Sequence, residues 1–267
     1  MRDALVAVGL VALVVPLVAQ SQGGGGGLGP VDALGQQVRR PPAPTGPAPR
    51  LPDGTIDLGD GTWIGSTGDF ARALPQGESM PLLPAARALM AERAKRETDD
   101  PHLWCLPMGV PRQTVYPFRF VQNYSHQKPT HMFILHEGNI HSYRQIFMDG
   151  RKHPSELDPT WFGHSIGSWE KDTLVIDTVG FNDKFWFDRL GTPHTEQLHT
   201  VERWTRVNMG NLENRVTIDD PGAFSRPFTL TFNARLSPPG DELMEYICQE
   251  NNQFGIASGH DSPFVGP

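Results

Sequence analysis

Positive charge is scarce in this sequence. Its 267 residues contain 23 Lys and Arg against 30 Asp and Glu, so the formal net charge at neutral pH is −7. A chain with this balance lacks the overall positive field that holds a nucleic-acid backbone or an anionic membrane surface. We therefore expect no nucleic-acid partner.

Long hydrophobic runs are absent except at the N-terminal end. Residues 4–19 form an apolar stretch broken only by Gly9 and Pro16, and polar residues follow at once. A membrane-spanning helix needs roughly 20 apolar residues, so this stretch is short for a span. It predicts an export signal at residues 1–19, with a membrane anchor as the alternative. The expected location is secreted or periplasmic, with no membrane span left after cleavage.

Residues 20–50 hold few side chains that could form a core. They are rich in Gly and Pro and include five consecutive glycines at 23–27. Such a segment buries too little apolar surface to offset its ordering entropy. We predict a disordered linker at 20–50 and one β-rich domain at 51–267, which lies within the usual size of a single domain.

Only two cysteines are present, Cys105 and Cys248. In an exported chain two cysteines of one domain are expected to form a disulfide. A loop of this length contributes on the order of 4–5 kcal/mol in the chain-entropy model. Two separate buried thiols are the alternative.

Several signatures of cofactor and nucleophile chemistry are missing. The chain has no Gly-x-Ser-x-Gly elbow, no Gly-x-x-x-x-Gly-Lys phosphate loop and no Gly-x-Gly-x-x-Gly dinucleotide turn. We therefore expect no cofactor. Nucleotide-dependent chemistry and serine-esterase chemistry of the usual kind are both disfavoured.

The folded region begins with one strong helix signal and continues with short β-type runs. Residues 84–96 start with Pro and consist mainly of good helix formers. In the run at 228–236 apolar and polar residues alternate, so one face of that strand is expected to be dry. The predicted strands are 115–123, 131–136, 140–147, 165–169, 173–179, 199–207, 212–218, 228–236 and 243–248.

Short turns between these runs favour neighbours that pair in chain order. The pattern predicts a mainly β fold with one N-terminal helix. Its strands are expected to form an up-and-down antiparallel β-barrel or strongly curled sheet of the lipocalin-like kind. A two-sheet β-sandwich is the alternative.

Segment 180–206 has the highest density of imidazole and carboxylate groups. Histidine exchanges a proton near neutral pH, and a carboxylate can orient or oppose it. We predict that His194, Glu196 and His199 act as catalytic acid, base or orienting group. Structural or solvated histidines are the alternative.

Aromatic, arginine and amide side chains around this segment are suited to a substrate pocket, because they stack on flat ligands and bind polar groups. Core or rim packing is the alternative role for the tryptophans. The predicted substrate-binding residues are Tyr143, Arg144, Trp161, Asn182, Trp186, Glu202 and Arg203.

A second pair of histidines suggests an alternative metal site. If residues 137–140 form a turn, His136 and His141 face one another with Cβ atoms about 5 Å apart. Two imidazoles at that distance can share a zinc or copper ion. Neither histidine group matches a defined metalloenzyme signature, so no metal is expected and this pair remains the alternative.

Short motifs spread over residues 51–252 are similar to those of a recurrent family of secreted bacterial proteins. They are PDGTIDLGDGTW (52–63), CLPMGVPR (105–112), YRQIFMDGR (143–151), WEKDTLV (169–175), GFND (180–183), PHTEQLHTVER (193–203) and TIDDP (217–221). The resemblance implies a secreted β-rich domain and no defined activity. His136 and His141 fall outside these motifs.

Two functions of different classes follow from these features. One is an exported acid–base enzyme, a hydrolase or lyase, that acts on a small glycoside-like or aromatic compound. The other is a lipocalin-like protein that binds a small molecule inside the barrel without catalysis. Both expect a small-molecule partner, and the oligomeric state stays open.

Overall fold

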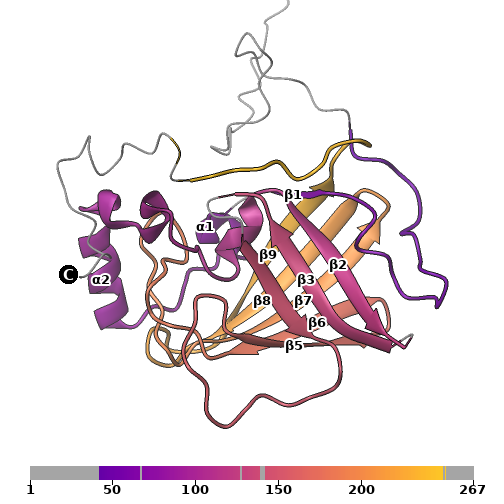
Figure 1. Ribbon diagram of the computed structural model, residues 1–267. Coiled ribbons are helices and arrows are strands. Elements are labelled where there is room, and N and C mark those ends of the chain that lie inside the picture. The colour runs from indigo at the N-terminus through magenta and orange to yellow at the C-terminus, as the bar shows by residue number, and fades with distance from the viewer. Residues whose placement is uncertain (1–41, 67, 127, 139–141, 249, 251–267) are drawn as a thin grey trace, which may run out of the picture. The chain divides into compact units, whose positions relative to one another are not determined.

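The computed structural model describes residues 42–66, 68–126, 128–138, 142–248 and 250 (Figure 1). These residues all fall in one compact unit, residues 39–267. The predicted signal peptide, the predicted linker up to residue 41 and His141 lie outside the described residues. Within the described ranges, no helix combines the length and the apolar character that a bilayer crossing requires.

Nine strands of the described chain form a closed barrel in which neighbours follow sequence order (Figure 1). The predicted β-barrel class is therefore confirmed over the β-sandwich. The strands are β1 (Trp63–Gly65), β2 (Phe118–Ser125), β3 (Lys128–His136), β4 (Ser142–Phe147), β5 (His164–Glu170), β6 (Thr173–Val179), β7 (His199–Asn208), β8 (Asn211–Asp219) and β9 (Phe228–Leu236).

One strand pair departs from the predicted up-and-down order. Strands β4 and β5 are parallel, whereas every other neighbouring pair is antiparallel. Parallel strands cannot be joined by a tight turn. Residues 148–163 therefore form a crossover that leads from the end of β4 back to the level at which β5 begins.

The barrel closes through a strand that the sequence did not predict. Strand β1 pairs with one residue of β2 and with three residues of β9, and so closes the barrel. The predicted strand at 243–248 is wrong, because these residues form no strand. That segment instead runs past the barrel, where Arg119 pairs with Glu242 at 2.6 Å and the Met244 amide donates to Glu137.

The helical part is more divided than the single helix predicted from sequence. Helix α2 (Pro84–Arg93) ends three residues before the predicted boundary, and a short helix α1 (Phe70–Ala73) precedes it. The Asp69 side chain caps α1 by accepting from the Ala71 amide at 2.9 Å. Three 3₁₀ turns follow at Glu97–Asp99, Pro101–Trp104 and Arg112–Val115.

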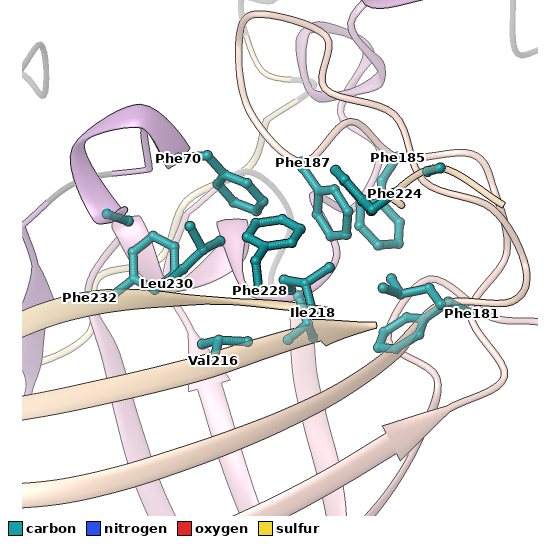
Figure 2. Close-up of a cluster of buried hydrophobic side chains, with 14 of the residues drawn as sticks. Phe70, Phe181, Phe185, Phe187, Val216, Ile218, Phe224, Phe228, Leu230 and Phe232 are labelled. Atoms are coloured by element: carbon teal, nitrogen blue, oxygen red, sulfur yellow. The ribbon is translucent and has the colours of Figure 1, made fainter. Parts of the chain in front are cut away.

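An aromatic cluster packs on the inner faces of β8 and β9 (Figure 2). Phe70 comes from α1, while Phe181, Phe185 and Phe187 come from the long connection between β6 and β7. We call these four residues with Phe224 the aromatic plug. All five are 2% exposed or less. The apolar residues of segment 180–206 thus pack in the core. Sequence reasoning missed this role because it considered only the polar residues of the segment.

Polar side chains separate the plug from a second apolar cluster. Along β8, Leu212 belongs to the second cluster, Asn214 is polar and Val216 packs with the plug, and all three are buried. The second cluster comprises Ile56, Leu58, Trp63, Phe118, Phe120, Met132, Ile134, Ile146, Leu174, Ile176, Trp204, Leu212 and Ala234.

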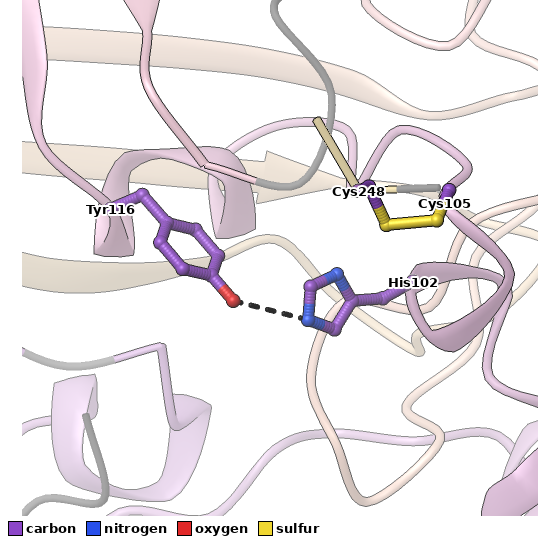
Figure 3. Close-up of a disulfide and its surroundings, with 4 residues drawn as sticks. All are labelled: His102, Cys105, Tyr116 and Cys248. Atoms are coloured by element: carbon purple, nitrogen blue, oxygen red, sulfur yellow. Dashed lines mark hydrogen bonds between the residues drawn. A yellow bond between two sulfur atoms is a disulfide. The ribbon is translucent and has the colours of Figure 1, made fainter. Parts of the chain in front are cut away.

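The predicted disulfide is confirmed. Cys105 and Cys248 are joined with their Cα atoms 5.6 Å apart, across 143 positions of sequence. Beside the bridge the Tyr116 hydroxyl lies 3.2 Å from Nε2 of His102 (Figure 3). The bridge ties the C-terminal segment to the 3₁₀ turns that precede β2.

Replacing both cysteines by serine should lower the free energy of unfolding by about 4–5 kcal/mol, because the unfolded chain regains the freedom of a very long loop. Guanidinium denaturation of the variant and of the wild type, each with and without reductant, measures this. A reductant should shift the midpoint of the wild type alone. Coincident curves for both proteins in the absence of reductant would contradict the expectation.

Candidate functional site

Two of the predicted substrate-binding residues meet inside the barrel. Arg144 on β4 and Glu202 on β7 form an ion pair whose side chains are 3% and 0% exposed. Arg144 also donates to Ser165 at 3.1 Å and to Thr178 at 2.6 Å, and Asn214 donates to Glu202 at 3.2 Å. We call these five residues the inner network. Because they are sealed from solvent and hydrogen-bonded to one another, their role here is structural, although Oδ1 of Asn214 has no partner.

His136 also lies inside the barrel, and this weakens the alternative metal site. Its register partner on β4 is Ser142, whereas the alternative metal site requires position 141 opposite it. Its ring stacks on Phe162 with centroids 6.2 Å apart. Burial, followed by the positive charge of Arg144, lowers the pKa of His136 to about 3.

His194 is a packing residue of the aromatic plug. Its ring centroid lies 3.9 Å from that of Phe185 and 4.8 Å from that of Phe187, and Nε2 lies 2.9 Å from the Phe185 carbonyl oxygen. Burial lowers the pKa of His194 to about 4. A neutral, enclosed imidazole of this kind is not placed to meet a substrate.

The predicted catalytic trio does not converge. His194 faces the plug, Glu196 is exposed, and His199 is bound to Asp177 on the outer wall. The reason is the strand that begins at residue 199. Its alternation turns His199 outward, whereas His194 belongs to the loop before it, which folds over the core.

The other predicted substrate-binding residues are dispersed. Tyr143 is 60% exposed on the outer wall, and Arg203 pairs with Glu170 at the surface. Asn182 is buried, where its side chain accepts the Lys184 amide in a local turn. Trp161 is half-buried against the plug, and Trp186 is 4% exposed beneath the guanidinium of Arg93.

His199 belongs to a chain of hydrogen-bonded groups on the outer wall that was not predicted. Its Nε2 lies 2.9 Å from Oδ1 of Asp177, and Nε2 of His153 lies 3.1 Å from the same oxygen. Nδ1 of His153 lies 2.8 Å from Nδ1 of His164. We call these four residues the histidine relay.

Strand register builds the relay from distant parts of the sequence. On β6, Asp177 pairs with Val201 of β7, so His199 is its diagonal neighbour on the outer face. His164 on β5 is a diagonal neighbour from the other side, because its register partner is Val179. The crossover 148–163 supplies His153, which lies between Asp177 and His164 and contacts both.

The partners determine where the ring protons lie. An ionised carboxylate only accepts hydrogen bonds, so Nε2 of His153 and of His199 carry protons. When Nδ1 of His164 donates to Nδ1 of His153, Nε2 of His164 is left as an acceptor. These assignments leave ring nitrogens available at both ends of the relay, one on His164 and one on His199. The side chains of His153, Asp177 and His199 are 20%, 39% and 38% exposed, so solvent reaches the site.

His164 is held in its neutral form by its surroundings. Partial burial, then the proximity of His153 and of Arg151, lowers the pKa of His164 below its usual value. The ring of His164 stacks on that of Phe147 with centroids 5.0 Å apart. The guanidinium carbon of Arg151 lies 3.9 Å from the centroid of the Phe147 ring. A neutral, partly exposed imidazole beside a histidine that is hydrogen-bonded to a carboxylate is suited to accept a proton.

The relay is not arranged as a metal site. His153 turns its two ring nitrogens to different partners, and among the described residues no three His, Cys, Asp or Glu side chains are placed to hold a metal ion. A cavity of about 300 Å³ lies elsewhere, and no predicted site residue lines it. Its lining comes from residues 42, 44, 60–62, 119 and 236–242.

Comparisons with protein-family models, with curated proteins and with solved structures give no match for this chain. The arguments on function therefore rest on the geometry of the site.

Glu202→Ala should lower the free energy of unfolding by about 3–5 kcal/mol, because it leaves the buried charge of Arg144 without its partner. Glu196→Ala is the matched control, since Glu196 is exposed and its loss should change stability by less than about 0.5 kcal/mol. Urea denaturation of both variants measures the two effects. Equal destabilisation would contradict the assignment of the inner network.

Acid should destabilise the protein below pH 6.5 through its buried histidines. Because the pKa of His194 is about 4 in the folded chain and about 6.5 when unfolded, the unfolded state binds more protons between these values. The free energy of unfolding then falls by about 1.4 kcal/mol per pH unit for this residue, and likewise for His136.

His194→Gln should flatten this dependence, measured as the loss of unfolding free energy between pH 7 and pH 5 by denaturant titration. His126→Gln, at an exposed position, serves as the control and should retain the wild-type loss. A wild-type slope in the His194 variant would refute the role of that ring.

Proposed function

We propose that this protein is an exported acid–base enzyme, a hydrolase or a lyase, that acts on a small glycoside-like or aromatic compound at the outer wall of the barrel. The observation that carries the proposal is the histidine relay, a continuous hydrogen-bonded chain from His199 through Asp177 and His153 to His164. It joins two solvent-accessible imidazoles through one carboxylate.

The relay supplies a base with a path for the proton. Nε2 of His164 accepts a proton from the substrate or from an attacking water. Nδ1 of His164 then passes its own proton to Nδ1 of His153, and the negative charge of Asp177 stabilises the imidazolium that results. At the other end His199, also held by Asp177, is the candidate acid: Nδ1 takes up a proton from solvent and gives it to the departing group, and His153 releases its extra proton to solvent.

The alternative, a lipocalin-like protein with a ligand inside the barrel, is less well supported. A ligand cavity in a barrel requires inward positions with small side chains or empty space. Here inward positions carry large buried residues such as Trp63, Phe118 and Phe120, and the inner network occupies the layer between the apolar clusters.

The export part of the proposal is supported by the disulfide, since such bonds persist in oxidising compartments. The resemblance to secreted bacterial proteins is a second support. Two of its motifs, residues 143–151 and 193–203, supply Phe147, Arg151 and His199 to the relay and its surroundings.

Asp177→Asn should lower kcat by about 10²- to 10⁴-fold, because an amide cannot stabilise an imidazolium as a carboxylate does. Turnover is measured on a panel of p-nitrophenyl glycosides between pH 5 and pH 9. Because partial burial lowers the pKa of His164, the wild type should keep its kcat through the usual titration range of a histidine and lose it only at more acidic pH.

Asp172→Asn is the matched control, because Asp172 is an exposed carboxylate on the β5–β6 turn that pairs with Arg50. It should retain wild-type kcat. An Asp177 variant that is as active as this control would exclude the relay. A wild type that binds members of the panel and converts none would favour the binding protein instead.

A further inference from the structure

A row of aromatic rings crosses the outer wall and ends at the histidine relay. Tyr143 lies edge-on to Phe133 with centroids 6.0 Å apart, and Phe133 stacks on His131 at 5.7 Å. His131 contacts Phe147 at 5.3 Å, and Phe147 stacks on His164 of the relay. We call Tyr143, Phe133, His131 and Phe147 the aromatic row.

The row lies on the outward positions of β3 and β4. Register partners Phe133 with Gln145 and His131 with Phe147 show that the two strands present these rings to the same face. The core does not require them there, because the inward positions of both strands already pack inside the barrel. Tyr143 is 60% exposed, and Val121 and Tyr124 on neighbouring β2 are 41% and 42% exposed. A contiguous apolar and aromatic surface of this kind is typical of an interaction site.

The open shape of the surface limits the chemistry of its ligand. A wholly apolar ligand gains affinity by enclosure, and this wall is a convex sheet face. A nucleic acid would meet a chain of net charge −7. A saccharide fits better, because a sugar ring lays one apolar face of C–H groups on an aromatic ring while its hydroxyl groups remain hydrated.

Polar groups beside the row suit the hydroxyl edge of a sugar. Arg151 lies over Phe147 and is paired with Asp149, so donors and acceptors stand together at the border of the row. Asp219 is the register partner of His199 and adds an outward carboxylate next to the relay. Carboxylates and guanidinium groups bind adjacent hydroxyls through directed hydrogen bonds.

We propose that a saccharide chain binds along the aromatic row, with Tyr143 and Phe133 holding the sugar units farthest from the relay. The reacting unit then lies beside His164 at the end of the row, because Arg151 and His164 already cover the ring of Phe147. The position of the reacting unit rests on the proposed acid–base function, whereas binding along the row does not.

The test measures dissociation constants of cellohexaose, xylohexaose, laminarihexaose and chitohexaose by isothermal titration calorimetry. At least one hexasaccharide should bind the wild type, and Tyr143→Ala and Phe133→Ala should each weaken it about tenfold or more. Tyr246→Ala, at a 46% exposed tyrosine outside the row, should bind as the wild type does. Binding of none of the four sugars, or equal weakening in the Tyr246 variant, overturns the proposal.

His164→Gln separates this proposal from the proposed function. It should keep hexasaccharide affinity and lose release of reducing ends, whereas the two row variants should raise KM with little change in kcat. Binding without turnover by the wild type would support saccharide binding along the row and contradict the acid–base function. Turnover with unchanged KM in the row variants would support the acid–base function and contradict binding along the row.

Discussion

The ion pair between Arg144 and Glu202 is the constraint on which the rest of the barrel depends. Its two charges are sealed from solvent between two apolar clusters, so they are tolerable only when every hydrogen-bond partner is in place. Those partners come from β5, β6 and β8, and the ion pair itself joins β4 to β7. Five strands must therefore hold one relative register for the interior to be stable.

The same register forms the candidate site on the other side of the wall. On three adjacent strands the residue that faces outward into the relay is followed directly by a buried polar residue of the interior. The pairs are His164 with Ser165, Asp177 with Thr178, and His199 with Thr200. Because a slip of one residue exchanges the faces of a strand, the inner network excludes registers in which the relay is not formed.

The candidate site was only partly accessible to sequence reasoning. His199 was identified because imidazole and carboxylate groups are dense around it, but density does not distinguish outward residues from buried ones. His194 belongs to that same group and packs on Phe185. The alternation along β6 places Asp177 on the face opposite to Ile176 and Thr178. This pattern could have identified Asp177 as an outward carboxylate. Nothing local indicated His153, because a crossover without regular structure brings it to the relay.

The sequence by itself determined the period-two alternation of strands such as Phe228–Leu236, the hairpin at Glu170–Thr173 and the presence of two cysteines for one bridge. These are local or counting properties, which a chain carries before it folds. Only the tertiary structure decided that β1 closes the barrel, that β4 and β5 run parallel, and that His199 meets Asp177 and His153. Alternation fixes which face a side chain occupies, whereas neighbours across the sheet depend on closure and crossover geometry that no single segment encodes.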